Sequence, residues 1–159
     1  MRGCHPAVAS RAFGGPIVAS LRGLDCEAVQ ASVRSEVRGD GTPTLELGDP
    51  AERPVLLFFH GWPDTSALWA NQFAAFCGED GEYACVAPSM MDYHPDVAPA
   101  EDASRLSWPT QADVLHEVVL DLGLEDVTLV MHDFGSIVGS SECSKKRRGD
   151  YFLPRAFGS

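Results

Sequence analysis

Two short segments that are apolar on both faces constrain the fold of this 159-residue chain more than any other feature. They are residues 54–59 (PVLLFF) and 127–131 (VTLVM). Neighbouring side chains of a strand point to opposite faces, so a strand that is apolar throughout must be covered on both sides. Central strands of parallel sheets have this environment. The sequence therefore predicts a mostly parallel sheet with helices on each face.

The remaining strands complete an α/β pattern. Residues 31–48 alternate around a turn at Gly39-Asp40-Gly41 and predict a β-hairpin, which we place at one edge of the sheet. Residues 83–87 are a further short apolar strand that ends at Pro88. The order of strands and intervening helices indicates parallel strands joined through helices, which is the α/β class.

Two helices are expected between these strands. The first would be capped by Asp64 or Thr65 and end at Gly78, and the second would begin at Ser107 and Pro109 and end at Gly123. Each has apolar residues at helical spacing, which we assign to the core. These residues are Trp69, Phe73 and Phe76 in the first helix and Ala112, Leu115, Val119 and Leu122 in the second.

Charge and cysteine content exclude several classes of protein. The net charge of −11 argues against nucleic acid or an anionic membrane as a partner. No apolar run approaches the roughly 18 residues of a membrane span. The five cysteines are scattered and lack zinc-ligand spacing, so we expect reduced thiols, no metal and no cofactor.

The segment with the clearest chemistry follows the strand 127–131. There His132, Asp133, Phe134, Gly135 and Ser136 join the strand to a predicted helix. A strand, a sharp turn and a helix with a nucleophile at the tip form a nucleophile elbow, and a small residue two positions later avoids a clash with the preceding strand. The alternative is that Asp133 merely caps the helix.

Residues 54–135 resemble the α/β-hydrolase fold, in its branch of epoxide hydrolases and haloalkane dehalogenases. The resemblance rests on three features in this order: the sequence HGWPD at 60–64, the helix 112–123 followed by LEDVTLV, and an elbow with Asp at its tip. It implies a truncated α/β-hydrolase core. The rest of the catalytic domain is expected beyond this segment.

The resemblance also implies roles for four residues. Asp133 matches the nucleophile that forms an ester with the substrate. The backbone N–H groups of Phe134 and Trp62 match the oxyanion donors, and His60 matches a residue that supports the loop. His132 is interpreted as non-catalytic, because adjacent residues on a sharp turn point apart.

The residues beside Asp133 favour one branch of the family. Dehalogenases resemble one another in placing an indole N–H beside the nucleophile, whereas Phe134 has no donor, and Trp62 stands where they often carry Asn. The substrate expected of the completed enzyme is therefore a small epoxide or ester. Two other positions depart from the family pattern: Met131 replaces a small residue, and Ser89 replaces Asp.

The resemblance places the catalytic acid and His after the nucleophile, but residues 134–159 contain no His. We therefore expect a 159-residue chain that is inactive, with strand 127–131 as an open edge of the sheet. The alternative is a non-catalytic half-domain that binds a partner or is the product of a truncated gene model.

Three regions are expected along the chain. Residues 1–30 form a ragged terminus or transit segment, residues 31–140 the partial hydrolase domain, and residues 141–159 an atypical basic tail. The expected location is the cytoplasm, or an organelle if the Arg-, Ala- and Ser-rich N-terminus is a transit peptide.

Overall fold

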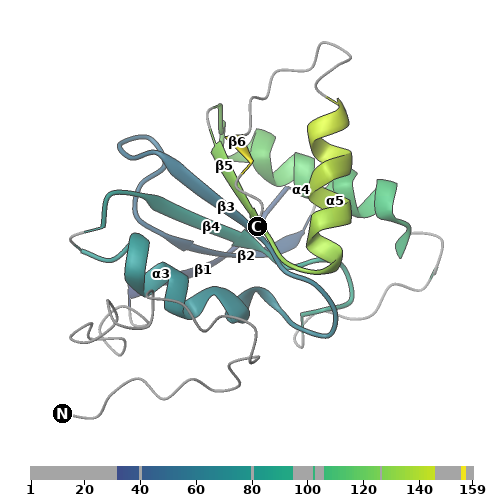
Figure 1. The fold of residues 1–159 in the computed structure, drawn as a ribbon, viewed down its shortest axis with the longest axis horizontal. Helices are drawn as coiled ribbons and strands as arrows, with labels where there is room; N and C mark the ends of the chain where they lie inside the picture. The colour runs from purple at the N-terminus through teal and green to yellow at the C-terminus, as the bar shows by residue number, and fades with distance from the viewer. Residues whose placement is uncertain are drawn as a thin grey trace.

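A computed structural model of the chain describes residues 32–39, 41–79, 81–94, 102, 106–125, 127–145 and 155–156. A six-stranded sheet forms its centre, in the order β1-β2-β4-β3-β5-β6, with helices on both faces (Figure 1). The elements are β1 (Arg34–Arg38), β2 (Thr42–Leu47), β3 (Val55–Phe59), the 3-10 helix η1 (Ser66–Trp69), α3 (Ala70–Phe76), β4 (Ala84–Pro88), α4 (Trp108–Asp121), β5 (Val127–Met131), α5 (Phe134–Lys145) and β6 (Arg155–Ala156).

The pairing of the strands confirms the predicted sheet. β3 lies between β4 and β5 and is parallel to both. β1 and β2 form the predicted antiparallel hairpin, and β2 pairs with β4. The chain leaves β4 through α4 and returns on the other side of β3 as β5. Since the carboxyl ends of β3 and β5 are adjacent, the loops that follow them meet at one edge of the sheet.

The alternating side chains of β3 separate two apolar layers. Val55, Leu57 and Phe59 face a cluster that includes Leu115 of α4 and Val138 of α5. Leu56 and Phe58 face the opposite cluster, which contains Trp69 and Phe73. Phe58 is buried, with its ring centroid 5.0 Å from that of Trp69 and 5.5 Å from that of Phe73. This arrangement explains why β3 is apolar at every position.

The helix boundaries follow local capping chemistry. Of the two predicted caps of the first helical segment, Thr65 is the one observed: its side chain accepts a hydrogen bond from the Ala67 N–H at 3.3 Å. Ser107 caps α4 in the same way. Gly123 follows α4 with a φ of 60°, a conformation that favours glycine. Phe76, predicted to be core, is instead 40% exposed, because α3 ends there. Of the three aromatic residues assigned to the core, Trp69 and Phe73 belong to the apolar cluster on that face of the sheet.

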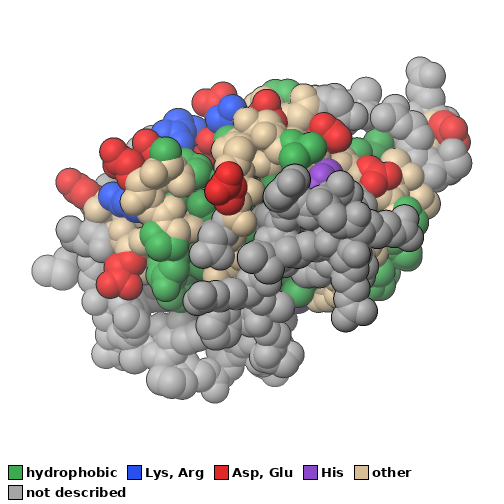
Figure 2. Space-filling view, turned by 90° about the horizontal axis from the view of Figure 1, so that it is seen from above, with side chains coloured by type: hydrophobic (Ala, Val, Ile, Leu, Met, Phe, Trp, Pro, Cys, Tyr) green, Lys and Arg blue, Asp and Glu red, His purple; other side chains and the backbone are tan. Residues whose placement is uncertain are grey.

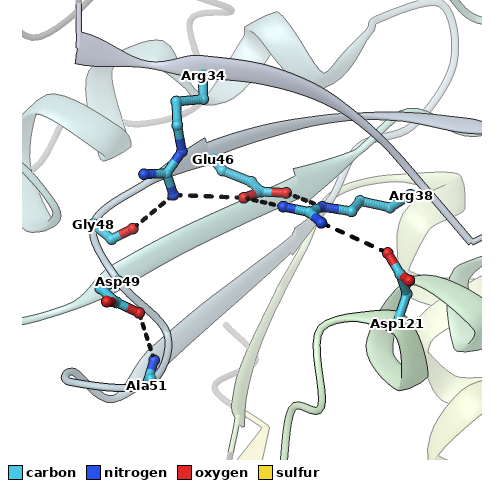
Figure 3. A network of polar contacts seen from close by, with 7 residues as sticks. All are labelled: Arg34, Arg38, Glu46, Gly48, Asp49, Ala51 and Asp121. Atoms are coloured by element: carbon cyan, nitrogen blue, oxygen red, sulfur yellow. Dashed lines mark hydrogen bonds and ion pairs between the residues drawn. The ribbon is translucent and has the colours of Figure 1, made fainter.

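A buried carboxylate fixes the hairpin to the rest of the domain (Figure 3). Glu46 of β2 accepts hydrogen bonds from both the Nε and an Nη of Arg38 on β1, at 2.6 and 3.0 Å. Arg34 approaches the same carboxylate, and Arg38 also reaches Asp121 at the end of α4. The hydrogen bond to Glu46 is the main cause of a raised Arg38 pKa. The edge strand β1 is thus linked by ion pairs to both its neighbour and α4.

At the far edge of the sheet, the structure differs from one of the expectations. β6 pairs in parallel with β5, with Thr128 opposite Arg155 and Leu129 opposite Ala156. The prediction that 127–131 forms an open edge is therefore wrong over these two positions, because residues 155–156 return to the sheet. The pairing of β5 with β6 joins segments that are distant in sequence, so no local pattern predicts it. The predicted transit segment 1–30 and most of the basic tail lie outside the described residues.

The cysteine prediction also needs correction. Cys77, at the end of α3, and Cys85, in β4, are joined by a disulfide, with their Cα atoms 5.8 Å apart. The expectation of reduced thiols is wrong for this pair. The two residues are eight positions apart in sequence, and the packing of α3 against β4 brings them together.

On the face shown in Figure 2, acidic side chains outnumber Lys and Arg over the described part of the surface, in keeping with the net charge. In the described ranges, no helix has both the length and the apolar character required to cross a bilayer.

Candidate active site

Asp133 lies at the turn between β5 and α5, with a backbone φ of 52°. Residues other than glycine rarely adopt this left-handed conformation, so its presence here marks a strained turn. Such strain is a feature of the strand-turn-helix elbow. The Asp133 side chain is exposed at the carboxyl edge of the sheet.

Gly135 permits the elbow to sit against β3. A Cβ placed on Gly135 would collide with the carbonyl oxygens of Phe59 and His60 and would lie 2.7 Å from the carbonyl carbon of Phe59. The backbone of the turn is also held by a hydrogen bond from the His132 N–H to the Phe59 carbonyl at 3.0 Å. The steric role predicted for Gly135 is therefore confirmed.

The loop after β3 approaches Asp133 closely. The Trp62 N–H donates a hydrogen bond to Oδ1 of Asp133 at 3.1 Å. Gly61 allows this approach, because a Cβ there would lie 2.6 Å from the same oxygen. Phe134 is the first residue of α5, and the N–H groups of a first helical turn have no partner within the helix. The structure thus brings Asp133 and the backbone of Trp62 together, with the Phe134 N–H adjacent to Asp133 in the chain.

His60 is fully buried behind this loop, and both of its ring nitrogens are engaged. Nε2 accepts a hydrogen bond from the Met90 N–H at 3.0 Å, and Nδ1 donates to the Gly61 carbonyl at 3.1 Å. These two bonds require the neutral ring with its proton on Nδ1. Burial lowers the pKa of His60, because it disfavours the charged form. His60 therefore joins the loops that follow β3 and β4.

Two further residues border the site. Tyr93, in the loop after β4, is partly buried, and its ring packs edge-on against His60 with the ring centroids 5.6 Å apart. Burial raises the Tyr93 pKa, and the charge of Asp133 raises it further. His132 contributes less: within the described residues, its buried Nδ1 has no hydrogen-bond partner. These contacts place Tyr93 near the carboxylate and give no support for His132 as a base.

Trp108 was not identified from the sequence as a site residue. It is the first residue of α4, and its ring centroid lies 4.9 Å from that of Phe134. Only the tertiary arrangement reveals the pair, since the two residues are 26 positions apart in sequence. In the sequence, the feature that could have drawn attention to Trp108 is its position directly after the helix cap Ser107.

The two departures from the family pattern are accommodated locally. Met131 packs against Gly139 of α5, where a Cβ would collide with the Met131 sulfur. Ser89 is buried, and its hydroxyl hydrogen bonds to that of Ser66 at 2.8 Å. No group of three or more His, Cys, Asp or Glu side chains suited to a metal ion occurs among the residues that the structure describes.

Comparison with known proteins identifies the class that this fold and elbow define. A model of the alpha/beta hydrolase family matches residues 56–154, which is more than half of the chain. The chain therefore belongs to the α/β-hydrolase family. The recognition of an epoxide hydrolase-like α/β-hydrolase core from the sequence is confirmed.

Individual proteins of known sequence or structure show which members of the family the chain is similar to. An epoxide hydrolase of Caballeronia sordidicola is 33% identical over 94 residues, which are 58% of this chain and 27% of that protein. A non-heme chloroperoxidase of Kitasatospora aureofaciens is 37% identical over 83 residues, 52% of this chain and 28% of that protein. The structure of epoxide hydrolase VrEH1 from Vigna radiata matches 81% of this chain and 41% of its own, with 26% identity and a TM-score of 0.66. The chain thus spans about 27% of the length of the first curated relative.

Proposed function

We propose that Asp133 is the nucleophile of an epoxide hydrolase-like reaction on a small molecule. The observation that carries the proposal is the strained φ of Asp133 combined with the 3.1 Å hydrogen bond from the Trp62 N–H to its carboxylate. A residue that merely capped α5 would have no need of a donor from a loop 71 positions earlier. The similarity to epoxide hydrolases supports the choice of substrate class.

The hydrogen bond distinguishes the two carboxylate oxygens. Oδ1 is held by the Trp62 N–H, so Oδ2 is the oxygen free to attack. Attack forms a bond between Oδ2 and a ring carbon of the epoxide, the bond between that carbon and the ring oxygen breaks, and the ring oxygen takes a proton from solvent water, which leaves hydroxide. Oδ1 then becomes the carbonyl oxygen of the ester, already beside the Trp62 N–H.

The same donors serve the second half of the reaction. When water attacks the ester carbonyl, negative charge develops on Oδ1, where we place the N–H groups of Trp62 and Phe134 as the oxyanion hole. His60 supports this loop and is not the base, because both ring nitrogens are already engaged. Activation of the water needs a further base, which typically contributes about 10²–10⁴-fold to the rate.

The 159-residue polypeptide is therefore expected to form the ester and to hydrolyse it very slowly. The test is to mix the purified chain with excess epoxide and to measure how much epoxide each chain consumes. We expect close to one equivalent, and none with Asp133→Asn. Sustained turnover that Asp133→Asn abolishes would contradict the expected inactivity and would mean that another group of this chain, such as His132, serves as the base. Equal consumption by both proteins would contradict the nucleophile.

A further inference from the structure

An aromatic pair lies directly beside the proposed nucleophile. Trp108 and Phe134 meet at 4.9 Å between ring centroids, with their planes inclined by 48°. Phe134 is the residue after Asp133, so its position is fixed by the elbow. Trp108 belongs to α4, which returns the chain from the carboxyl end of β4 toward the start of β5. The N-terminus of α4 is therefore at the same edge of the sheet as Asp133.

Both tryptophans at this edge expose apolar surface. Trp62 is 61% exposed and Trp108 is 37% exposed, although a Trp side chain gains most from burial. Trp62 follows β3, Phe134 follows β5 and Trp108 begins α4. Three aromatic residues from three separate elements thus lie at the edge of the sheet that carries Asp133.

Trp108 contacts the core through Phe134, which packs against one of the two apolar clusters. Its side chain belongs to neither of the two apolar clusters that cover the sheet. The start of α4 is set by the Ser107 cap and by Pro109 within the first turn, and neither requires an aromatic neighbour. An exposed indole held against the residue next to a nucleophile is suited to contact with a ligand.

We propose that Trp108 and Phe134 form an apolar wall that binds the substituent of the epoxide, and that the preferred substituent is an aryl ring. The inference rests on the proposed function of Asp133. Two tilted rings offer a third ring both stacking and edge contacts, which a short alkyl group makes less well. Phe134 directly follows Asp133, so we expect a ring bound against this wall to bring the epoxide near the carboxylate.

The test separates binding from chemistry. In the Asp133→Asn chain, which cannot form the ester, the dissociation constants of styrene oxide and 1,2-epoxybutane are measured by ligand-observed NMR. We expect tighter binding of styrene oxide. Adding Trp108→Ala should weaken it roughly 2- to 10-fold, with little change for 1,2-epoxybutane, and Trp108→Phe should retain most of the preference. Leu120→Ala, another exposed apolar residue of α4, is the matched control.

Three outcomes would overturn the inference: no preference for styrene oxide, equal weakening of both epoxides by Trp108→Ala, or the same effect from Leu120→Ala. Failure of the proposed function has a different signature. In that case the unmodified chain consumes no epoxide through Asp133, while the aryl preference and its dependence on Trp108 persist.

Discussion

Replacing Gly135 with Ala tests whether the elbow positions Asp133. The added Cβ would lie 2.7 Å from the carbonyl carbon of Phe59, whereas two carbon atoms pack best at about 3.5–4.0 Å. The turn must therefore move by roughly 0.5–1 Å. The hydrogen bond from Trp62 to Asp133 is 3.1 Å long, so a shift of this size takes it beyond the ~3.5 Å limit of a hydrogen bond.

Two measurable effects follow from Gly135→Ala. Overpacking lowers the free energy of unfolding by about 1–3 kcal/mol, which is a loss of roughly 1 M in the urea midpoint. The same shift moves the Asp133 carboxylate out of its position for attack, and because misplacement of a reacting group by about 1 Å costs up to about 10²-fold in rate, ester formation should slow by about tenfold or more. Urea titration and the rate of epoxide consumption measure the two effects.

Gly123→Ala is the matched control. Gly123 has a φ of 60°, yet no atom lies within 4 Å of the position of a new Cβ. This substitution introduces backbone strain of about 1 kcal/mol without a collision, at the opposite end of β5 from the elbow. It should lower stability and leave ester formation unchanged. A Gly135→Ala chain that reacts as fast as the unmodified chain would refute the steric reasoning.

Three further predictions concern stability. The pKa of His60 is lowered in the folded state, so the unfolded chain binds more protons than the folded chain as the pH drops below about 6.5. The urea midpoint should therefore fall as the pH is lowered over this range. His60→Gln should remove the part of this decrease that His60 causes. Glu46→Gln should lower the free energy of unfolding by about 1–3 kcal/mol at pH 7, because it breaks a buried bidentate pair; no change would show that the network adds nothing. Phe58→Ala should cost about 3–5 kcal/mol by urea titration, against a small effect for the exposed Phe76→Ala.

Much of the fold could be predicted because its determinants are local. The burial of both faces of residues 55–59 follows from an unbroken apolar run, and the end of α4 follows from Gly123. The juxtaposition of Asp133 and Trp62 could also be inferred, since parallel neighbouring strands place their following loops at one edge.

The features that the sequence did not reveal depend on contacts between distant segments. The disulfide between Cys77 and Cys85 requires knowledge of how α3 packs on β4. The exposure of Phe76 depends on where α3 ends relative to the sheet. Trp108 meets Phe134 only because α4 starts beside α5, and its position directly after the Ser107 cap does not by itself predict that contact.

The most direct test of the central claim is to locate the covalent adduct. The chain is incubated with styrene oxide, quenched, digested and sequenced by mass spectrometry. We expect one adduct with the mass of the epoxide on the Asp133 side chain, reduced by Gly135→Ala and absent from Asp133→Asn. An adduct on another residue, or none on Asp133 after prolonged incubation of the folded chain, would contradict it.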